Sequence, residues 1–129
     1  MLFSSGRCAR IGQDRYRTEI TVGGRDLIAD EPPALGGQGA GFAPYDLLLA
    51  SLGACTAITL RMYADRKGWP MESLEVGLRL HGTEERRIDR TLTIVGLDEE
   101  QRARMADIAE RTPVTLTLKT GLPIDTRLV

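Results

Sequence analysis

The feature that most limits the possible folds is an apolar run from Leu47 to Leu60, in which the only polar side chains are Ser51, Thr56 and Thr59. Pro44 precedes the run and suits the first turn of a helix, where its missing N–H has no consequence. Neither proline nor a helix-ending glycine follows until Gly68-Trp69-Pro70. The pattern therefore predicts one helix of about 24 residues, roughly 36 Å long.

The first half of this helix is apolar on every side, so it must be buried. The apolar run is shorter than the ~20 residues of a membrane span, which favours a core helix and no membrane. One small sheet can cover only one side of such a helix. Because monomers rarely expose large apolar patches, we expect a homodimer in which this half lies against its symmetry mate.

The remaining segments alternate between short strands and one further helix. Gly23-Gly24 predicts a tight turn in a hairpin, and Asp98 with Gln101 predicts a helix-initiating capping box. The expected strands are 16–22 paired with 25–29, 74–81 paired with 87–95, 114–118, and an edge strand at 123–129. We therefore predict one α+β domain over residues 1–129, with antiparallel sheets around a long buried central helix.

Composition excludes several classes of function. A formal net charge of -1 gives no electrostatic basis for binding nucleic acid or an anionic membrane surface. The start of the chain has no signal-peptide pattern and only two cysteines occur, so we expect the reducing cytoplasm. One histidine and two widely separated cysteines provide no paired metal-ligand spacing, and we expect neither metal nor cofactor.

Cys55 lies within the apolar run and is the residue that could carry chemistry. It is about three turns from the start of its helix, beyond the reach of the positive end of that helix. A reactive Cys55 therefore requires a cation from another segment; the candidates are Arg15, Arg17 and Arg25, with Asp46 or Glu19 to orient one of them. The alternative is that Cys55 is only a small core residue.

Several motifs together resemble the OsmC/Ohr family of osmotically inducible and organic hydroperoxide resistance proteins. They are Asp30-Glu31-Pro32, Gly36-Gly37, Pro44-x-Asp46 followed by three leucines, Ala54-Cys55-Thr56, Lys67-Gly68-Trp69, and the segment from Ile108 to Val114. The resemblance implies an intertwined α+β homodimer with the cysteine of the central helix in an apolar pocket at the interface. It implies that Cys55 is the peroxidatic thiol, which attacks the O–O bond of an organic hydroperoxide and becomes a sulfenic acid.

The sequence departs from the family pattern at two positions. Thr112 stands where the family peroxidases carry a resolving cysteine, so the usual intramolecular disulfide cannot form, and Cys8 is the only other thiol. Tyr45 stands where they carry the glutamate that orients the catalytic arginine, with Asp46 one place later. The spacing to Gly36-Gly37 makes Arg15 the first choice for that arginine.

These observations lead to two hypotheses; a third possibility, a redox sensor in which oxidation of Cys55 alters a partner contact, has no recognition surface in the sequence to support it. The first is a thiol-dependent peroxidase that reduces organic hydroperoxides through Cys55 alone, in defence against oxidative stress, with an external thiol as reductant. The second is a non-catalytic dimer that binds a small hydrophobic ligand at its interface pocket.

Overall fold

The computed structural model describes residues 6–129. The chain divides into two compact units, one up to Leu48 and the other from Leu49 to Val129. The long helix α1, Pro44–Lys67, contains the boundary between them. Each unit is therefore described by itself, and the organisation of residues 1–129 as one domain stays a prediction.

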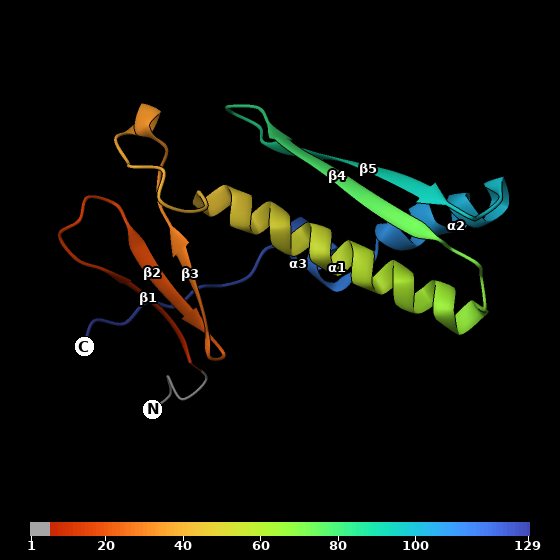
Figure 1. The fold of residues 1–129 in the computed structure, drawn as a ribbon, viewed down its shortest axis with the longest axis horizontal. Helices are drawn as coiled ribbons and strands as arrows, with labels where there is room; N and C mark the ends of the chain where they lie inside the picture. Colours follow the sequence, from red (N-terminus) through yellow and green to blue (C-terminus); the bar gives the residue numbers. More distant parts are fainter. Residues whose placement is uncertain (1–5) are drawn as a thin grey trace. The chain divides into compact units, whose positions relative to one another are not determined.

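The first unit contains a three-stranded antiparallel sheet in the order β1-β2-β3 (Figure 1). Its strands are β1 (Arg7–Ile11), β2 (Thr18–Val22) and β3 (Arg25–Ala29). Gly23 and Gly24 both have positive φ, 56° and 80°, as a tight two-residue hairpin turn requires. The predicted hairpin is confirmed, whereas β1 was not predicted. A short 3₁₀ helix, η2 (Pro33–Leu35), follows β3.

Helix α1 begins and ends where the proline and glycine signals predict. By length and composition it could cross a membrane, a property that the core helices of soluble proteins share. Its buried residues form one stripe at four-residue spacing: Leu52, Thr56, Leu60 and Ala64. Ile58 and Met62, on another face, are 59% and 57% exposed. The expected burial on every side is therefore not achieved by a single chain, which covers one face.

The second unit packs the β4–β5 hairpin against the helices. The strands β4 (Ser73–His81) and β5 (Arg87–Val95) form the predicted hairpin. They pair antiparallel, from Ser73 with Val95 to His81 with Arg87. Figure 1 shows this hairpin along α1. Gly53 permits the close packing, because a Cβ there would lie 3.1 Å from Cδ1 of Leu78. The core contains Leu60, Ala64, Met71, Leu97, Met105 and Ala109.

Two short helices complete the second unit. The predicted capping box at Asp98 and Gln101 is present and starts α2, Glu99–Ala109. The predicted strand 114–118 is wrong, because these residues belong to the helix α3, Pro113–Thr120. Alternating valine, leucine and threonine favour a strand, but tertiary contacts override such local preferences. The predicted edge strand 123–129 is also wrong: residues 121–129 are exposed and form no regular structure.

Candidate functional site

The sulfur of Cys55 lies at the N-terminus of another helix. Cys55 is half-buried on α1, and its Sγ accepts a hydrogen bond from the backbone N–H of Val114 at 3.5 Å. Val114 is the second residue of α3. The Oγ1 of Thr59 is the other hydrogen-bonding neighbour of the sulfur within residues 6–129, at 4.0 Å. The first turn of a helix has free N–H groups and the positive end of the dipole, which favour negative charge at that place.

Sequence analysis missed this contact because it predicted a strand after Pro113. The signal was nevertheless present, since threonine followed by proline is typical of an N-cap and first helical residue. Thr112 is the N-cap of α3 and Pro113 is its first residue. A helix dipole near Cys55 therefore comes from α3 rather than from α1.

Thr112 is fully buried beside this contact. Its Oγ1 lies 2.6 Å from Oγ1 of Thr115, within the first turn of α3. Thr112, the position at which the sequence departs from the expected pattern, thus stands beside Cys55 and supplies a hydroxyl rather than a thiol. Cys8, on β1 in the first unit, is exposed. No second thiol of the second unit stands near Cys55, because Cys8 and Cys55 are the two cysteines of the chain.

Arg15 is exposed in the turn between β1 and β2, in the first unit. Its φ of 50° lies in the left-handed region, which is unfavourable for a residue with a Cβ. Its Nη1 donates a hydrogen bond to the carbonyl of Gly36 at 2.8 Å. Among residues 6–129 it makes no ion pair, whereas Arg17 pairs with Glu19 at 3.3 Å. Arg15 therefore keeps its charge available while the Gly36 carbonyl orients its side chain.

The loop around Gly36 is held by Asp30, which is 3% exposed. Its carboxylate accepts hydrogen bonds from the backbone N–H groups of Ala40, Glu31 and Gln38 at 3.1, 2.7 and 3.3 Å. Several hydrogen bonds lower the pKa of Asp30 below its ordinary value, and the one from Ala40 has the largest effect. Gly37 has no alternative, because a Cβ there would lie 2.0 Å from the carbonyl oxygen of Glu31. The motifs Asp30-Glu31-Pro32 and Gly36-Gly37 thus build the loop to which Arg15 is bound.

Asp46 is exposed in the first turn of α1, in the first unit. Its side chain makes no hydrogen bond or ion pair with any of residues 6–129. A carboxylate in this place interacts favourably with the positive end of its own helix. The structure therefore gives Asp46 a role in starting α1 and shows no contact with Arg15. Arg15 and Asp46 belong to one unit, and Cys55 and Thr112 to the other.

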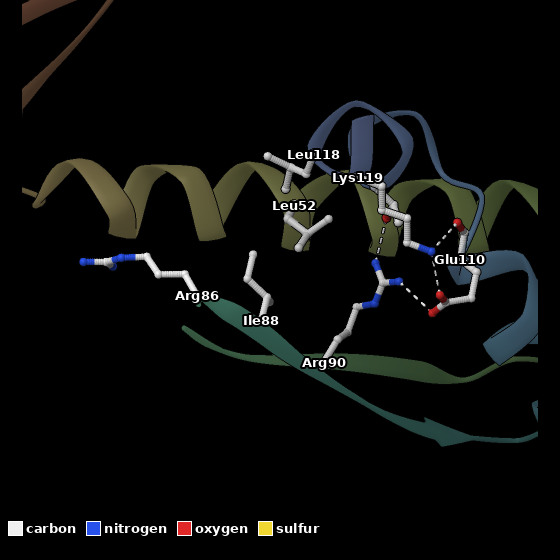
Figure 2. A pocket seen from close by; sticks show the side chains of 8 residues that line it. Leu52, Arg86, Ile88, Arg90, Glu110, Leu118 and Lys119 are labelled. Atoms are coloured by element: carbon white, nitrogen blue, oxygen red, sulfur yellow. Dashed lines mark hydrogen bonds and ion pairs between the residues drawn. The ribbon is translucent and has the colours of Figure 1, made fainter. Parts of the chain in front are cut away.

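A pocket of about 400 Å³ lies in the second unit between α1, β5, α2 and α3. Figure 2 shows two kinds of lining. Leu52, Ile88 and Leu118 form an apolar part. Arg90, Glu110 and Lys119 form an ion-pair cluster at one end, in which Glu110 lies 3.3 Å from Arg90 and 2.8 Å from Lys119. Arg86 points away from this cluster, so the pocket has an apolar middle between charged ends.

The cations at the charged end of the pocket lower the pKa of Glu110. The hydrogen bond from Lys119 is the main cause that lowers the pKa of Glu110, and Arg90 lowers it further. Glu110 is therefore ionised at neutral pH. With two cations and one anion, the cluster has a net positive charge.

No metal site is apparent in the part of the chain that the structure describes. Residues 6–129 contain no group of three or more histidine, cysteine or acidic side chains that could hold a metal ion. His81 lies 3.0 Å from Asp89, measured from Nε2 to Oδ2, and this contact is the main cause that lowers the pKa of Asp89.

Comparisons with known proteins agree with the family resemblance found in the sequence. The sequence profile of the OsmC-like protein family matches residues 37–127. No curated protein matches the sequence. Among solved structures, an organic hydroperoxide resistance protein OsmC from Legionella pneumophila is similar at TM-score 0.65, with 24% identity and 88% of each chain covered.

Two other solved structures share the fold. An OsmC-like protein from Mycoplasma pneumoniae has a TM-score of 0.70 and 18% identity, with 87% of this chain and 84% of that chain covered. The organic hydroperoxide resistance protein OhrB of Bacillus subtilis has a TM-score of 0.59 and 26% identity, with 91% of this chain and 92% of that chain covered. These similarities confirm the expected α+β fold.

Proposed function

Because the chain belongs to the OsmC-like protein family, we propose that it is a thiol-dependent peroxidase that reduces organic hydroperoxides through Cys55. The main observation that supports the proposal is the hydrogen bond that the backbone N–H of Val114 donates to the sulfur of Cys55. A thiolate is the nucleophilic form of cysteine, and a helix N-terminus stabilises it. Solved relatives named organic hydroperoxide resistance proteins support the substrate class.

The first step forms a sulfur–oxygen bond and breaks the O–O bond. The Cys55 thiolate attacks the terminal oxygen of the hydroperoxide, and the electron pair of the O–O bond leaves with the alkoxide. The alkoxide takes a proton and departs as the alcohol. Cys55 is oxidised to a sulfenic acid while the hydroperoxide is reduced by two electrons.

We propose that a thiol from outside the chain regenerates Cys55, because Thr112 stands at the position that the family resemblance assigns to a resolving cysteine. One external thiol condenses with the sulfenic acid to give a mixed disulfide and water. A second thiol then attacks this disulfide and releases Cys55 in its reduced form. A dithiol reductant in the reducing cytoplasm would supply both sulfur atoms.

A homodimer would complete the surroundings of the sulfur. Cys55, Ile58 and Met62 are spaced at i, i+3 and i+7, so they lie on one face of α1. Ile58 and Met62 are exposed on a single chain. A second copy on this face would bury both side chains and enclose Cys55 in apolar surroundings. Alkyl or aryl hydroperoxides would then be preferred over hydrogen peroxide, since each buried CH₂ contributes about 0.8 kcal/mol.

Arg15 is the cation that we propose for the thiolate. Its charge is not paired among residues 6–129, and the carbonyl of Gly36 fixes its direction. Guanidinium remains charged in apolar surroundings, so it can act in a site that favours organic substrates. Asp46 is the acidic group proposed to assist it.

The proposal is tested by turnover of cumene hydroperoxide with dithiothreitol, dihydrolipoamide or thioredoxin as reductant. We expect consumption with the wild type and with Cys8→Ser, because Cys8 is exposed in the other unit. Cys55→Ser is expected to lose the activity. Equal consumption by Cys55→Ser and the wild type, or none by either, would contradict the peroxidase.

The pocket favours a second function, in which the chain binds a small hydrophobic ligand without catalysis. Its volume of about 400 Å³ and its wall of Leu52, Ile88 and Leu118 fit a short alkyl chain. The net positive end would suit a carboxylate. Titration of octanoate into Cys55→Ser, with octanol for comparison, tests this function: saturable binding of octanoate supports it, and no binding of either compound contradicts it.

A further inference from the structure

Arg90 is a guanidinium held in the interior of the second unit. Its side chain is 12% exposed, although arginine is among the residues least often buried. Nη1 donates to Oγ1 of Thr56 at 3.0 Å and to Oγ1 of Thr115 at 2.8 Å. Nη2 donates to the carbonyl of Ala109 at 2.8 Å and to Glu110 at 3.3 Å. Burial of a charge is unfavourable unless it is well bonded, and these contacts meet that requirement.

The contacts of Arg90 join three helices beside Cys55. Thr56 follows Cys55 on α1, and Thr115 follows Val114 on α3. Ala109 is the last residue of α2, where a cation meets the negative end of the helix dipole. Arg90 therefore connects the end of one helix, the beginning of the next and the segment of α1 that carries the thiol.

Arg90 also donates to hydroxyl groups that make further hydrogen bonds of their own. The hydroxyl of Thr115 donates its single proton to the carbonyl of Ala109 at 3.2 Å and accepts from Arg90. The same hydroxyl lies 2.6 Å from Oγ1 of Thr112, and either of these two hydroxyls can donate in this contact. The hydroxyl of Thr56 donates to the carbonyl of Leu52 at 2.7 Å and accepts from Arg90. The first turn of α3 is thus fixed by a connected hydrogen-bond network.

We propose that Arg90 is a positioning residue for the thiol chemistry of Cys55. It makes no hydrogen bond with the sulfur and acts through α3, by holding the N–H of Val114 against Sγ. This inference deepens the proposed function and rests on it for its biological meaning. The effect on the thiol itself can be measured without any peroxide.

The test measures alkylation of Cys55 by iodoacetamide as a function of pH, in a Cys8→Ser background so that one thiol reacts. Arg90→Met retains an unbranched side chain but removes every donor. We expect alkylation at neutral pH to slow by about tenfold and the profile to move to higher pH, since a hydrogen bond to a charged group is worth at least this factor. Arg90→Lys keeps the charge but lacks the planar fork, so we expect partial rescue.

The matched control is Arg79→Met on the neighbouring strand β4. Arg79 is 72% exposed and pairs with Asp89 at 3.4 Å, away from the threonines. We expect it to alkylate like the parent protein. Circular dichroism checks the fold of each variant. If Arg90→Met does not fold, Thr115→Val removes one hydroxyl of the network with little change in shape and is expected to slow alkylation in the same direction.

The outcomes separate the two proposals. If folded Arg90→Met shows the wild-type pH profile of Cys55 alkylation, the positioning role is overturned. An equal change of this profile in Arg79→Met would also overturn it. Altered alkylation in Arg90→Met, together with absence of Cys55-dependent peroxide turnover in the wild type, would support the positioning role and contradict the peroxidase. Normal turnover and normal alkylation in Arg90→Met would support the peroxidase and overturn the positioning role.

Discussion

The backbone N–H of Val114 lies 3.5 Å from the sulfur of Cys55 and joins two residues 59 positions apart in the chain. The contact places the thiol of one helix at the beginning of another. Such an arrangement stabilises negative charge without any cationic side chain. In the second unit, the thiol therefore has a partner that the sequence pattern assigned to a strand.

Replacement of Val114 by proline tests this contact directly. Proline lacks the N–H but is tolerated in the first turn of a helix. We expect Val114→Pro to fold and to react with iodoacetamide about tenfold more slowly at neutral pH, because the hydrogen bond to the thiolate is lost. Val114→Ala keeps the N–H and is expected to react like the parent. Equal rates for the two variants would show that the N–H does not assist the thiol.

Replacement of Thr112 by cysteine tests the geometry of the missing resolving position. Residues 112–114 lie beside Cys55, so we expect Thr112→Cys to form an intramolecular disulfide with Cys55 after one equivalent of cumene hydroperoxide. Peptide mass spectrometry under non-reducing conditions would detect the linked peptides. Thr120→Cys, at the other end of α3, is the control and should remain unlinked. Absence of the link in Thr112→Cys would mean that the two sulfur atoms cannot meet.

Introduction of a charge on the exposed face of α1 tests the dimer. Ile58 is 59% exposed on a single chain, and in the proposed dimer it is buried. Ile58→Glu is expected to sediment as a monomer at micromolar concentration, because an unpaired carboxylate is costly to bury. Arg66→Glu, at the solvated end of the helix, should keep the wild-type sedimentation coefficient. A wild type that sediments as a monomer would contradict the dimer itself.

The stability of the loop that holds Arg15 should depend on pH, because Asp30 titrates. Backbone hydrogen bonds lower the pKa of Asp30 in the folded protein. Its contribution to stability is therefore fully present above the unfolded value near 3.8 and is lost as the pH falls through the lower folded value.

Asp30→Asn is expected to be less stable than the wild type at neutral pH, by chemical denaturation. The difference should shrink as the pH falls below the unfolded value near 3.8, and it should vanish once the pH is below the lower pKa of the folded carboxylate. Asp26→Asn on the exposed hairpin is the control, with little change expected at any pH. A stability difference for Asp30→Asn that stays constant down to pH 2 would contradict this role.

Sequence periodicity predicted the helices and strands correctly where the local preference of the residues and their tertiary contacts agree. Pro44 and Gly68 determine the limits of α1, and the Asp98 capping box determines the start of α2. Alternation in 74–81 and 87–95 predicts the hairpin, whose register the structure then provides. In these segments the burial pattern and the intrinsic preference of the residues indicate the same structure.

The prediction of secondary structure failed at 114–118, where contacts with distant parts of the chain determine the structure. Thr115 is β-branched and alternates with leucines, yet it is helical because its hydroxyl bonds Arg90 and Ala109 from other elements. Arg90 was not recognised, since its buried role depends on two threonines far away in the sequence. The roles of Arg15 and Asp46 toward Cys55 stay predictions, because they depend on how the two units and a second copy are arranged.

The most direct test of the central claim is a single-turnover reaction of reduced Cys8→Ser protein with stoichiometric cumene hydroperoxide, trapped with dimedone. Peptide mass spectrometry then locates the adduct, and the same reaction with hydrogen peroxide gives the comparison. The account predicts a sulfenic acid at Cys55 that forms faster with cumene hydroperoxide than with hydrogen peroxide. No adduct at Cys55, or equal rates with the two peroxides, would contradict it.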